Sequence, residues 1–148
     1  MNTIYISNIQ KTTRLPRKKI KLWAEEILNM LKIKNQVLSL LFIDDKEIKK
    51  LNKIYRDKNS ATDVLAFSMR EGRFSGVNPE ILGDVVISIE TARRRARERK
   101  ITTLKETLLY LIHGILHLLG YRDDSDKEKE KMKAKEKEIF SKLWNEEN

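Results

Sequence analysis

Residues 103–124 read TLKETLLYLIHGILHLLGYRDD, and this stretch holds both histidines of a chain of 148 residues. Within it, residues 104–119 are apolar almost all round, and the polar side chains are confined to the first turn. A helix of that composition is normally buried inside a domain. Gly120 supplies a natural left-handed helix end. The stretch therefore predicts a buried helix around which the core of the protein forms.

The start of this helix is predicted from Thr103 and Glu106, which have the spacing of a capping box. In such a box each side chain hydrogen-bonds a backbone N–H group that the first turn leaves without a partner. The apolar segment is too short to cross a bilayer, because spanning takes about 20 apolar residues. The sequence therefore places the helix inside a soluble domain.

His113 and His117 stand four residues apart in this helix, which puts both imidazoles on one face. Two imidazoles at that spacing can bind one zinc ion, and a catalytic zinc site needs a third protein ligand beside an open position. After Gly120 the chain can turn Asp123 back toward the histidines, and Asp124 is the competing carboxylate. The alternative is that both histidines are core residues bonded to backbone carbonyls.

Gly114 lies between the two histidines, inside the helix. A glycine in a helix interior costs ~1 kcal/mol relative to alanine, so its presence predicts a close approach to another element. It also occupies the position at which the zinc peptidase motif H-E-x-x-H carries its general base. The sequence therefore weakens a peptidase hypothesis, although a metal-dependent hydrolase of peptides or small molecules stays open as an alternative.

The run HGILHLLGY at residues 113–121 resembles the signature H-G-x-L-H-L-x-G-Y of the YbeY family, bacterial metal-dependent endoribonucleases implicated in ribosomal RNA maturation. That signature usually ends in a third histidine, six residues after the second, where this chain has Asp123. Further matches extend the resemblance along most of the chain: Leu51-Asn52, Tyr55-Arg56, the run TDVLAF at 62–67, and LGDV at 82–85.

The resemblance implies a metal-dependent, single-strand-specific endoribonuclease acting at the 3′ end of 16S ribosomal RNA and in ribosome quality control. It implies one Zn²⁺ per chain on His113, His117 and Asp123, although other divalent transition metals fit such ligands. It also implies a metal cleft beside a sheet edge where single-stranded RNA lies extended, and the ribosome or ribosomal proteins as partners. The oligomeric state stays open.

Arg56 is the candidate for stabilising charge on the reacting phosphate, because a guanidinium can donate two hydrogen bonds to phosphate oxygens. The resemblance supports this catalytic role beside His113 and His117. Its alternative is a surface arginine paired with a nearby aspartate. Asp63 and Asp84 are candidates for orienting an arginine or a histidine through hydrogen bonds. The alternatives are that Asp63 caps a turn and that Asp84 begins a strand.

The formal net charge is +9, from 31 basic and 22 acidic residues, and this balance favours polyanionic partners. The most basic segment is the predicted helix at 90–99, whose Arg93, Arg94 and Arg97 are candidates for binding RNA phosphates. Cysteine is absent, which excludes disulfides and thiolate ligands. No secretory leader or apolar run of membrane-spanning length is visible, so we expect a cytoplasmic protein without a membrane partner.

The order of elements predicts an α+β fold with a four-stranded mixed sheet covered by about five helices, in a single domain over 1–148. Strands are expected at 3–9, 37–43, 63–69 and 83–89, and helices at 16–31, 45–55, 90–99, 103–119 and 125–144. Residues 71–80 read as a flexible insertion. Beside the nuclease, a non-catalytic ribosome- or RNA-binding module with a structural metal remains the second hypothesis.

Overall fold

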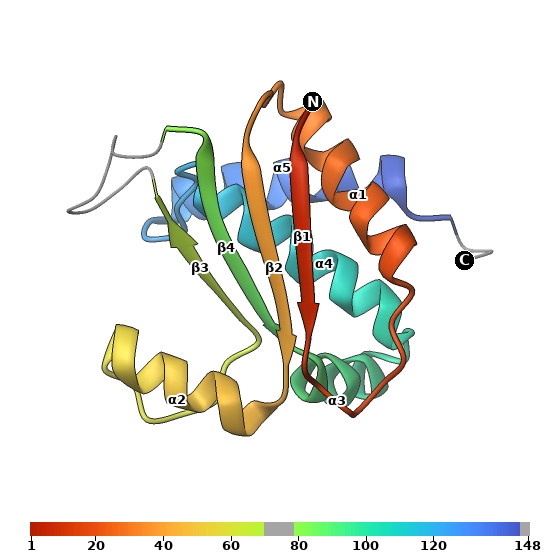
Figure 1. The fold of residues 1–148 in the computed structure, drawn as a ribbon, viewed down its shortest axis with the longest axis vertical. Coiled ribbons are helices and arrows are strands. Elements are labelled where there is room, and N and C mark those ends of the chain that lie inside the picture. The colour runs from red at the N-terminus through yellow and green to blue at the C-terminus, as the bar shows by residue number, and fades with distance from the viewer. Residues whose placement is uncertain (70–78, 146–148) are drawn as a thin grey trace.

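A computed structural model describes residues 1–69 and 79–145 of the chain. Its four strands and five helices are arranged as an α+β fold (Figure 1). Their bounds are β1 Thr3–Asn8, α1 Arg17–Met30, β2 Val37–Ile43, α2 Asp45–Arg56, β3 Val64–Ser68, β4 Ile81–Ser88, α3 Ile89–Arg99, α4 Thr103–Leu118 and α5 Asp126–Leu143. The predicted insertion at 71–80 lies outside the described residues apart from its last two.

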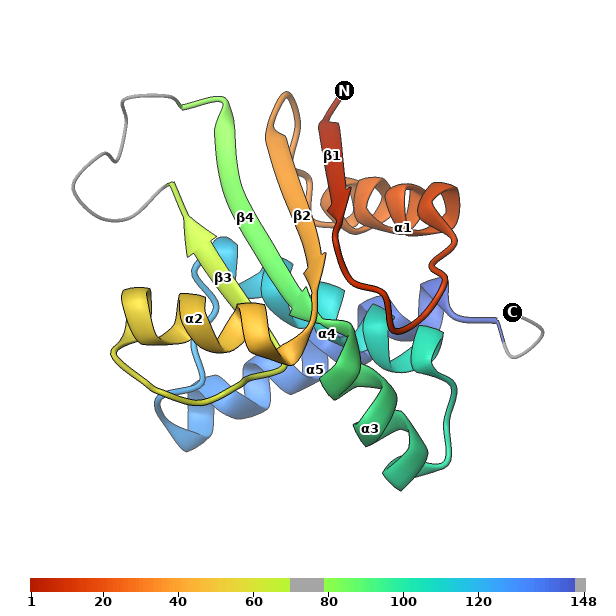
Figure 2. The same cartoon turned by 60° about the horizontal axis from the view of Figure 1, so that its bottom comes forward.

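The sheet has the strand order β1-β2-β4-β3, which confirms a four-stranded mixed sheet. β1 pairs with β2 and β2 with β4 in parallel, whereas β3 runs antiparallel to β4. β3 is therefore an edge strand of the described sheet. In Figure 1, α1, α4 and α5 lie behind the sheet. The turned view in Figure 2 shows α2 in front of the sheet, on the opposite face.

The core lies between the sheet and α4, as the apolar stretch predicts. β2 places Leu38, Leu40 and Phe42 on this side, and each is at most 1% exposed. The smaller cluster on the other face joins Ile43 and Ile48 to residues of β3 and β4, under α2. Because strand side chains alternate between faces, β3 is covered by α4 on one side and by α2 on the other.

The cap of α4 differs from the prediction by one residue. Thr102, rather than Thr103, is the N-cap, and its hydroxyl accepts a hydrogen bond from the Lys105 N–H. Glu106 does not reach back to the helix start. Its fully buried carboxylate accepts from the Arg99 guanidinium at 3.1 Å, so it ties α4 to the end of α3. An unpaired charge in the core would be strongly destabilising, whereas the first turn of α4 is already capped by Thr102.

The inward face of α2 is narrow. Ile48 is buried, but Ile54, six residues later, is 70% exposed. Six residues turn an α-helix by about 600°, which leaves Ile54 roughly 120° away from Ile48. Asn52 at i+4 occupies the inner face instead, and its side-chain amide donates to the Ser60 carbonyl. This bond holds the loop that leads into β3.

In the described part of the chain, no helix is both long enough and apolar enough to cross a membrane.

Candidate metal centre

The two histidines face each other at the C-terminal end of α4. Their Nε2 atoms are 3.0 Å apart, and the ring centroids are 4.5 Å apart. The one-face arrangement that the i, i+4 spacing predicts is therefore confirmed. Both side chains are partly exposed, because this end of α4 emerges from the core beside the edge strand β3.

A tight turn after α4 carries the third ligand back to the histidines. Gly120, at φ +96°, donates its N–H to the His117 carbonyl, and the Tyr121 N–H donates to the Leu116 carbonyl. These two bonds form a Schellman motif, which closes a helix through a left-handed residue. The turn leaves the Asp123 Oδ2 3.8 Å from Nε2 of His117.

One ligand atom from each of His113, His117 and Asp123 lies within 4.8 Å of the other two. The competing carboxylate of Asp124 pairs with Arg122 at 3.6 Å instead. A tetrahedral zinc ion with ligand bonds near 2.0–2.1 Å holds its donor atoms about 3.3 Å apart. The separations of 3.0 Å and 3.8 Å bracket that value, so the three residues fit a zinc-type ion.

Hydrogen bonds at the Nδ1 atoms set which nitrogen of each ring is available to a metal. His117 Nδ1 lies 3.0 Å from the Tyr121 carbonyl, which only accepts, so this nitrogen carries the proton. His113 Nδ1 lies 3.0 Å from the Glu136 Oε2 on α5. With both protons held at Nδ1, the two Nε2 lone pairs converge on the same point, as metal-ligating histidines require.

Glu136 is a candidate site residue that the sequence analysis did not single out. It lies on α5, 23 residues beyond His113, in a run of alternating lysine and glutamate. Such a run reads as a solvated face, and local periodicity does not single out one of its glutamates. Only the packing of α5 against α4 brings this carboxylate to the histidine.

The two histidines differ in how their surroundings shift the pKa. Burial disfavours the charged form of His113, but the hydrogen bond and charge of Glu136, with the charges of Asp63 and Asp123, outweigh it and raise the pKa. Burial and the neighbouring His113 lower the pKa of His117. Of the two rings, His113 therefore holds a proton to the higher pH. Protons compete with a metal ion for both rings, which makes metal binding weaker in acid.

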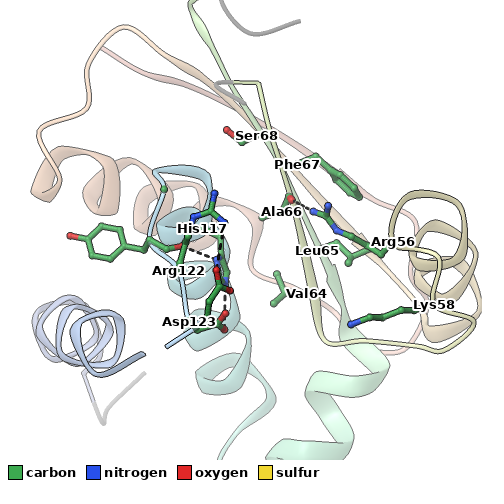
Figure 3. Close-up of a pocket in the computed structure, with 13 residues that line it drawn as sticks. Arg56, Lys58, Val64, Leu65, Ala66, Phe67, Ser68, His117, Arg122 and Asp123 are labelled. Atoms are coloured by element: carbon green, nitrogen blue, oxygen red, sulfur yellow. Dashed lines mark hydrogen bonds and ion pairs between the residues drawn. The ribbon is translucent and has the colours of Figure 1, made fainter. Parts of the chain in front are cut away.

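An open cleft of about 820 Å³ runs along the outer edge of β3. Figure 3 shows His117, Arg122 and Asp123 on one wall and Arg56 and Lys58 on the other, with β3 between them. The candidate ligands His117 and Asp123 therefore lie across the strand from the cations Arg56 and Lys58. This arrangement can hold a cation on one side and a phosphate backbone along the other.

Arg56 reaches the cleft from the last turn of α2. Its guanidinium donates to the Ala66 carbonyl at 2.7 Å and lies 5.2 Å from the centre of the Phe67 ring. Among the interactions of the described residues, no salt bridge joins it to Asp57 or Asp63. The alternative of an aspartate-paired surface arginine is therefore not what the structure shows.

Asp63 serves a different arginine. Its Oδ1 accepts from the Val64 N–H at 2.8 Å and its Oδ2 accepts from Arg95 at 3.2 Å. It therefore accepts hydrogen bonds from the backbone at the start of β3 and from an arginine of α3, and its orienting role at the metal site stays a prediction. Its charge also acts on His113.

Asp84 lies on the other face of the sheet from the metal ligands. Its neighbour in β4, Gly83, approaches Leu118 of α4, so by alternation Asp84 points away from α4. Its carboxylate accepts a hydrogen bond from Ser39 of β2. The structure does not bring Asp84 to a histidine or to Arg56, so no contact supports its predicted orienting role.

The α3 arginines lie apart from the metal cleft. Arg93, Arg94 and Arg97 surround a separate depression with Thr12 and Glu90. Arg94 is paired with an aspartate of α2, and Arg93 contacts the backbone carbonyl of Thr12 at 3.5 Å. The RNA-binding role of these three residues stays a prediction that concerns a second surface.

Gly114 marks the place where α4 approaches the sheet. A Cβ atom added there would lie 2.6 Å from Val85 Cγ1 and 3.2 Å from Val64 Cγ2. The close approach predicted from this glycine is confirmed. It sets the depth at which α4 sits and thereby places His113 and His117 beside the edge of β3.

Comparison with known proteins places the chain in one family. The family model described as Endoribonuclease YbeY matches residues 5–144. The chain is 40% identical to Endoribonuclease YbeY of Syntrophus aciditrophicus over 135 residues, covering 91% of this chain and 84% of the relative. It is 48% identical to the protein of that name from Aquifex aeolicus over 111 residues, covering 75% and 72%.

A solved structure shares the fold as well. The solution structure of TM1509 from Thermotoga maritima matches with a TM-score of 0.64 and 28% sequence identity, covering 97% of this chain and 89% of that one.

Proposed function

The chain belongs to the YbeY family of endoribonucleases, and we propose that it cleaves single-stranded RNA with a metal ion held by His113, His117 and Asp123. Its relatives carry the name of an endoribonuclease, so the chain is a hydrolase that acts on RNA. The observation that carries the proposal is the convergence of three ligand atoms within 4.8 Å on one wall of a cleft with a basic opposite wall.

A divalent ion bound here supplies Lewis acidity, which polarises a phosphoryl oxygen and lowers the pKa of water toward 7. The protein's own groups do the positioning. Tyr121 and Glu136 fix the histidine rings through their Nδ1 protons. Arg56, anchored on the Ala66 carbonyl, keeps further N–H groups for the oxygens of the reacting phosphate.

Peptide hydrolysis is disfavoured by the contact at Gly114. Position 114 faces the sheet, where even a Cβ atom would meet Val85 at 2.6 Å. A glutamate at this position, as in H-E-x-x-H, has no route from there to the metal. The basic wall of the cleft suits a phosphate backbone, whereas a peptide substrate has no need of it.

A purely structural metal is disfavoured by the openness of the site. Structural zinc is enclosed by four protein ligands, whereas catalytic zinc has three ligands and an open position. Among the described residues three ligands converge, and the third, Asp123, has a side chain that is 44% exposed in the cleft. This favours a nuclease over a binding module.

Zinc is the metal that we propose, because two imidazoles and one carboxylate match its preferred ligands. We further propose ribosomal RNA as the substrate and the 3′ end of 16S rRNA as the place of action. The ribosome or its proteins would then be the partners, and the cytoplasm the compartment. The net charge of +9 supports a polyanionic partner.

The mechanism is tested with His117→Ala. The zinc-loaded wild-type protein should cleave a single-stranded oligoribonucleotide, and the variant should lose metal-dependent cleavage, because a histidine ligand is gone. Far-UV circular dichroism checks that the variant keeps its fold. Unchanged cleavage by a folded His117→Ala protein would contradict this mechanism.

The ligand set is tested by elemental analysis of tag-free proteins. The wild-type chain and Asp124→Ala should each hold about one equivalent of metal, because Asp124 pairs with Arg122. Asp123→Ala should lose most of it. Equal metal content in all three would remove Asp123 from the ligand set, and no metal in any, after zinc addition, would favour the binding-module hypothesis.

A further inference from the structure

An aromatic pair that the proposed mechanism does not use lies at the wall of the cleft opposite the candidate metal ligands. Phe67 is partly buried and lines the cleft, and Tyr55 packs beside it from α2. The Tyr55 and Phe67 rings meet edge to face, with centroids 5.3 Å apart. Tyr55 is 61% exposed, at the last turn of α2. Exposed aromatic rings beside a basic groove are how proteins hold single-stranded nucleic acid, because every base has a face that stacks.

Arg56 connects this aromatic pair to the cleft. Its guanidinium lies 5.2 Å from the Phe67 ring centre while one N–H group donates to the Ala66 carbonyl. The same side chain therefore touches the aromatic pair and the backbone of the strand that floors the cleft. Lys58 adds a second cation to this wall (Figure 3).

The edge of β3 separates the aromatic pair from the metal ligands. Val64 points toward α4 and lies near Gly114, whereas Leu65 and Phe67 pack with the residues under α2. A phosphate at the metal ligands thus lies on one side of the strand edge. The neighbouring base, crossing the edge, arrives at the Phe67 side.

The aromatic pair is bounded on its inner side by a carboxylate. Phe67 is paired in register with Asp84, Asp84 with Ser39, and Ser39 with Tyr5. These four residues form one row across the open face of the sheet. The negative charge of Asp84 next to Phe67 opposes an RNA backbone there, which confines the strand to the edge of β3.

We propose that Tyr55 and Phe67 form a stacking subsite for the base of a nucleotide adjacent to the cleaved phosphodiester. The subsite rests on the proposed nuclease function and supplies a physical cause for its preference for single strands. A base in a duplex is stacked on its neighbours and cannot reach the aromatic pair. Arg56 then acts at both places, with its guanidinium over the Phe67 ring and its outer N–H groups toward the phosphate.

The experiment uses the zinc-loaded full chain and a single-stranded oligoribonucleotide whose cleavage position has been mapped. Single-turnover cleavage at increasing enzyme concentration gives an apparent Kd and a rate constant. We expect Tyr55→Ala to raise the Kd on the order of tenfold, the usual scale for one lost stacking contact. Tyr55→Trp should restore the affinity, because it keeps a stacking face.

Tyr5→Ala is the matched control. Tyr5 has the same exposure of 61% and lies in the same row of the sheet, but three strands away, at roughly 14 Å from the edge strand. Its replacement should leave the Kd within twofold of the wild type. A Tyr55→Ala protein that binds as tightly as Tyr5→Ala overturns the subsite.

An abasic nucleotide separates stacking from any structural effect of the substitution. With the base removed on either side of the cleavage position in turn, one of the two RNAs should bind wild type and Tyr55→Ala equally. A tenfold difference that persists on both abasic RNAs overturns the subsite, because the lost contact is then not with a base.

A fluorescent base distinguishes failure of the subsite from failure of the nuclease. 2-Aminopurine placed at the stacked position should be quenched on binding to the wild-type protein and not to Tyr55→Ala. Quenching without any cleavage keeps the subsite and removes the proposed nuclease function. Cleavage without quenching, at either neighbouring position, keeps the nuclease and removes the subsite.

Discussion

Glu136 acts on the metal site through a single hydrogen bond to Nδ1 of His113, at 3.0 Å. Carboxylate partners of metal-ligating histidines fix the ring and raise its basicity, and their loss costs 10–100-fold in metal affinity. We therefore expect Glu136→Gln to weaken zinc binding by about tenfold or more, measured by competition with a chromophoric chelator. The fold should remain intact, because this side chain is only partly buried.

Glu138 provides the control on the same helix. It is an exposed glutamate that pairs with Lys135 and Lys142 and makes no contact with a histidine. Glu138→Gln should bind zinc as the wild type does. Equal affinity in Glu136→Gln and Glu138→Gln would show that the contact with His113 does not tune the metal.

Gly114 controls stability through the space that it leaves for Val85. Gly114→Ala gains about 1 kcal/mol in helix propensity but drives a methyl group to within 2.6 Å of Val85 Cγ1. Overpacking of that kind costs about 1–3 kcal/mol, so we expect a lower free energy of unfolding in urea. In Gly114→Ala/Val85→Ala the two effects should be less than additive, because the second change opens the space that the first one fills.

At the scale of elements, Asp45 joins the starts of α2 and α3. Its carboxylate accepts hydrogen bonds from the Ser88 and Thr91 hydroxyls and from Arg94 at 3.1 Å. In return, the Glu90 carboxylate accepts from the Asp45 N–H at 2.8 Å. Glu90 of α3 therefore caps the start of α2, and the side-chain bonds of Asp45 hold the two helix starts together. This link fixes the position of α2, which carries Arg56.

The pKa of Asp45 gives this link a pH dependence. Burial raises the pKa, but the bonds from Ser88, Thr91 and Arg94 outweigh burial and lower it below the ordinary value of 3.8. A carboxyl group whose pKa is lowered by folding stabilises the protein above its unfolded pKa and loses this effect as the pH falls through the folded pKa. Asp45→Asn should therefore cost about 1–2 kcal/mol at pH 7 and progressively less below pH ~4.

Chemical denaturation of wild type and Asp45→Asn across this pH range measures the effect. Asp57→Asn is the control, because Asp57 ends α2 in the left-handed region at φ 55°, which asparagine also adopts. It should change the stability by a few tenths of a kcal/mol at most. A constant difference between wild type and Asp45→Asn at every pH would contradict the role of the charged carboxylate.

At the scale of the whole molecule, two separate depressions are lined by basic side chains. One is the cleft with Arg56, Lys58 and Arg122, and the other is the depression on α3 with Arg93 and Arg97. Each neutralised phosphate of a single strand contributes about 0.7 to the slope of log affinity against log salt concentration. The slope therefore measures how many phosphates of the RNA are neutralised by cationic side chains.

We expect a short oligoribonucleotide to give a slope of about −1.4, because Arg56 and Lys58 are within its reach and Arg122 is already paired with Asp124. A long single strand should give a steeper slope if it also reaches α3, and the pair Arg93→Gln/Arg97→Gln should then make it about 1.4 shallower. Fluorescence anisotropy over a salt series measures both. Arg94 contributes less, because Asp45 already neutralises it. An unchanged slope for the long RNA would remove α3 from the binding surface.

The sequence by itself determined α4, its burial and the shared face of His113 and His117. These features follow from the 3.6-residue period, which fixes the neighbours of a residue within its own helix. Gly120 likewise predicted the turn that carries Asp123, because a helix commonly ends at a glycine with a positive φ. The mixed four-stranded sheet followed from the order of the elements.

Only the tertiary structure determined which side chains of other elements contact the site residues. Glu136 reaches His113 because α5 packs on α4, and Arg56 meets Phe67 because α2 lies beside the edge strand β3. Asp84, by contrast, faces away from α4 because of the register of β4. Such contacts join segments far apart in the chain, and they depend on strand order and helix packing, which local periodicity does not specify.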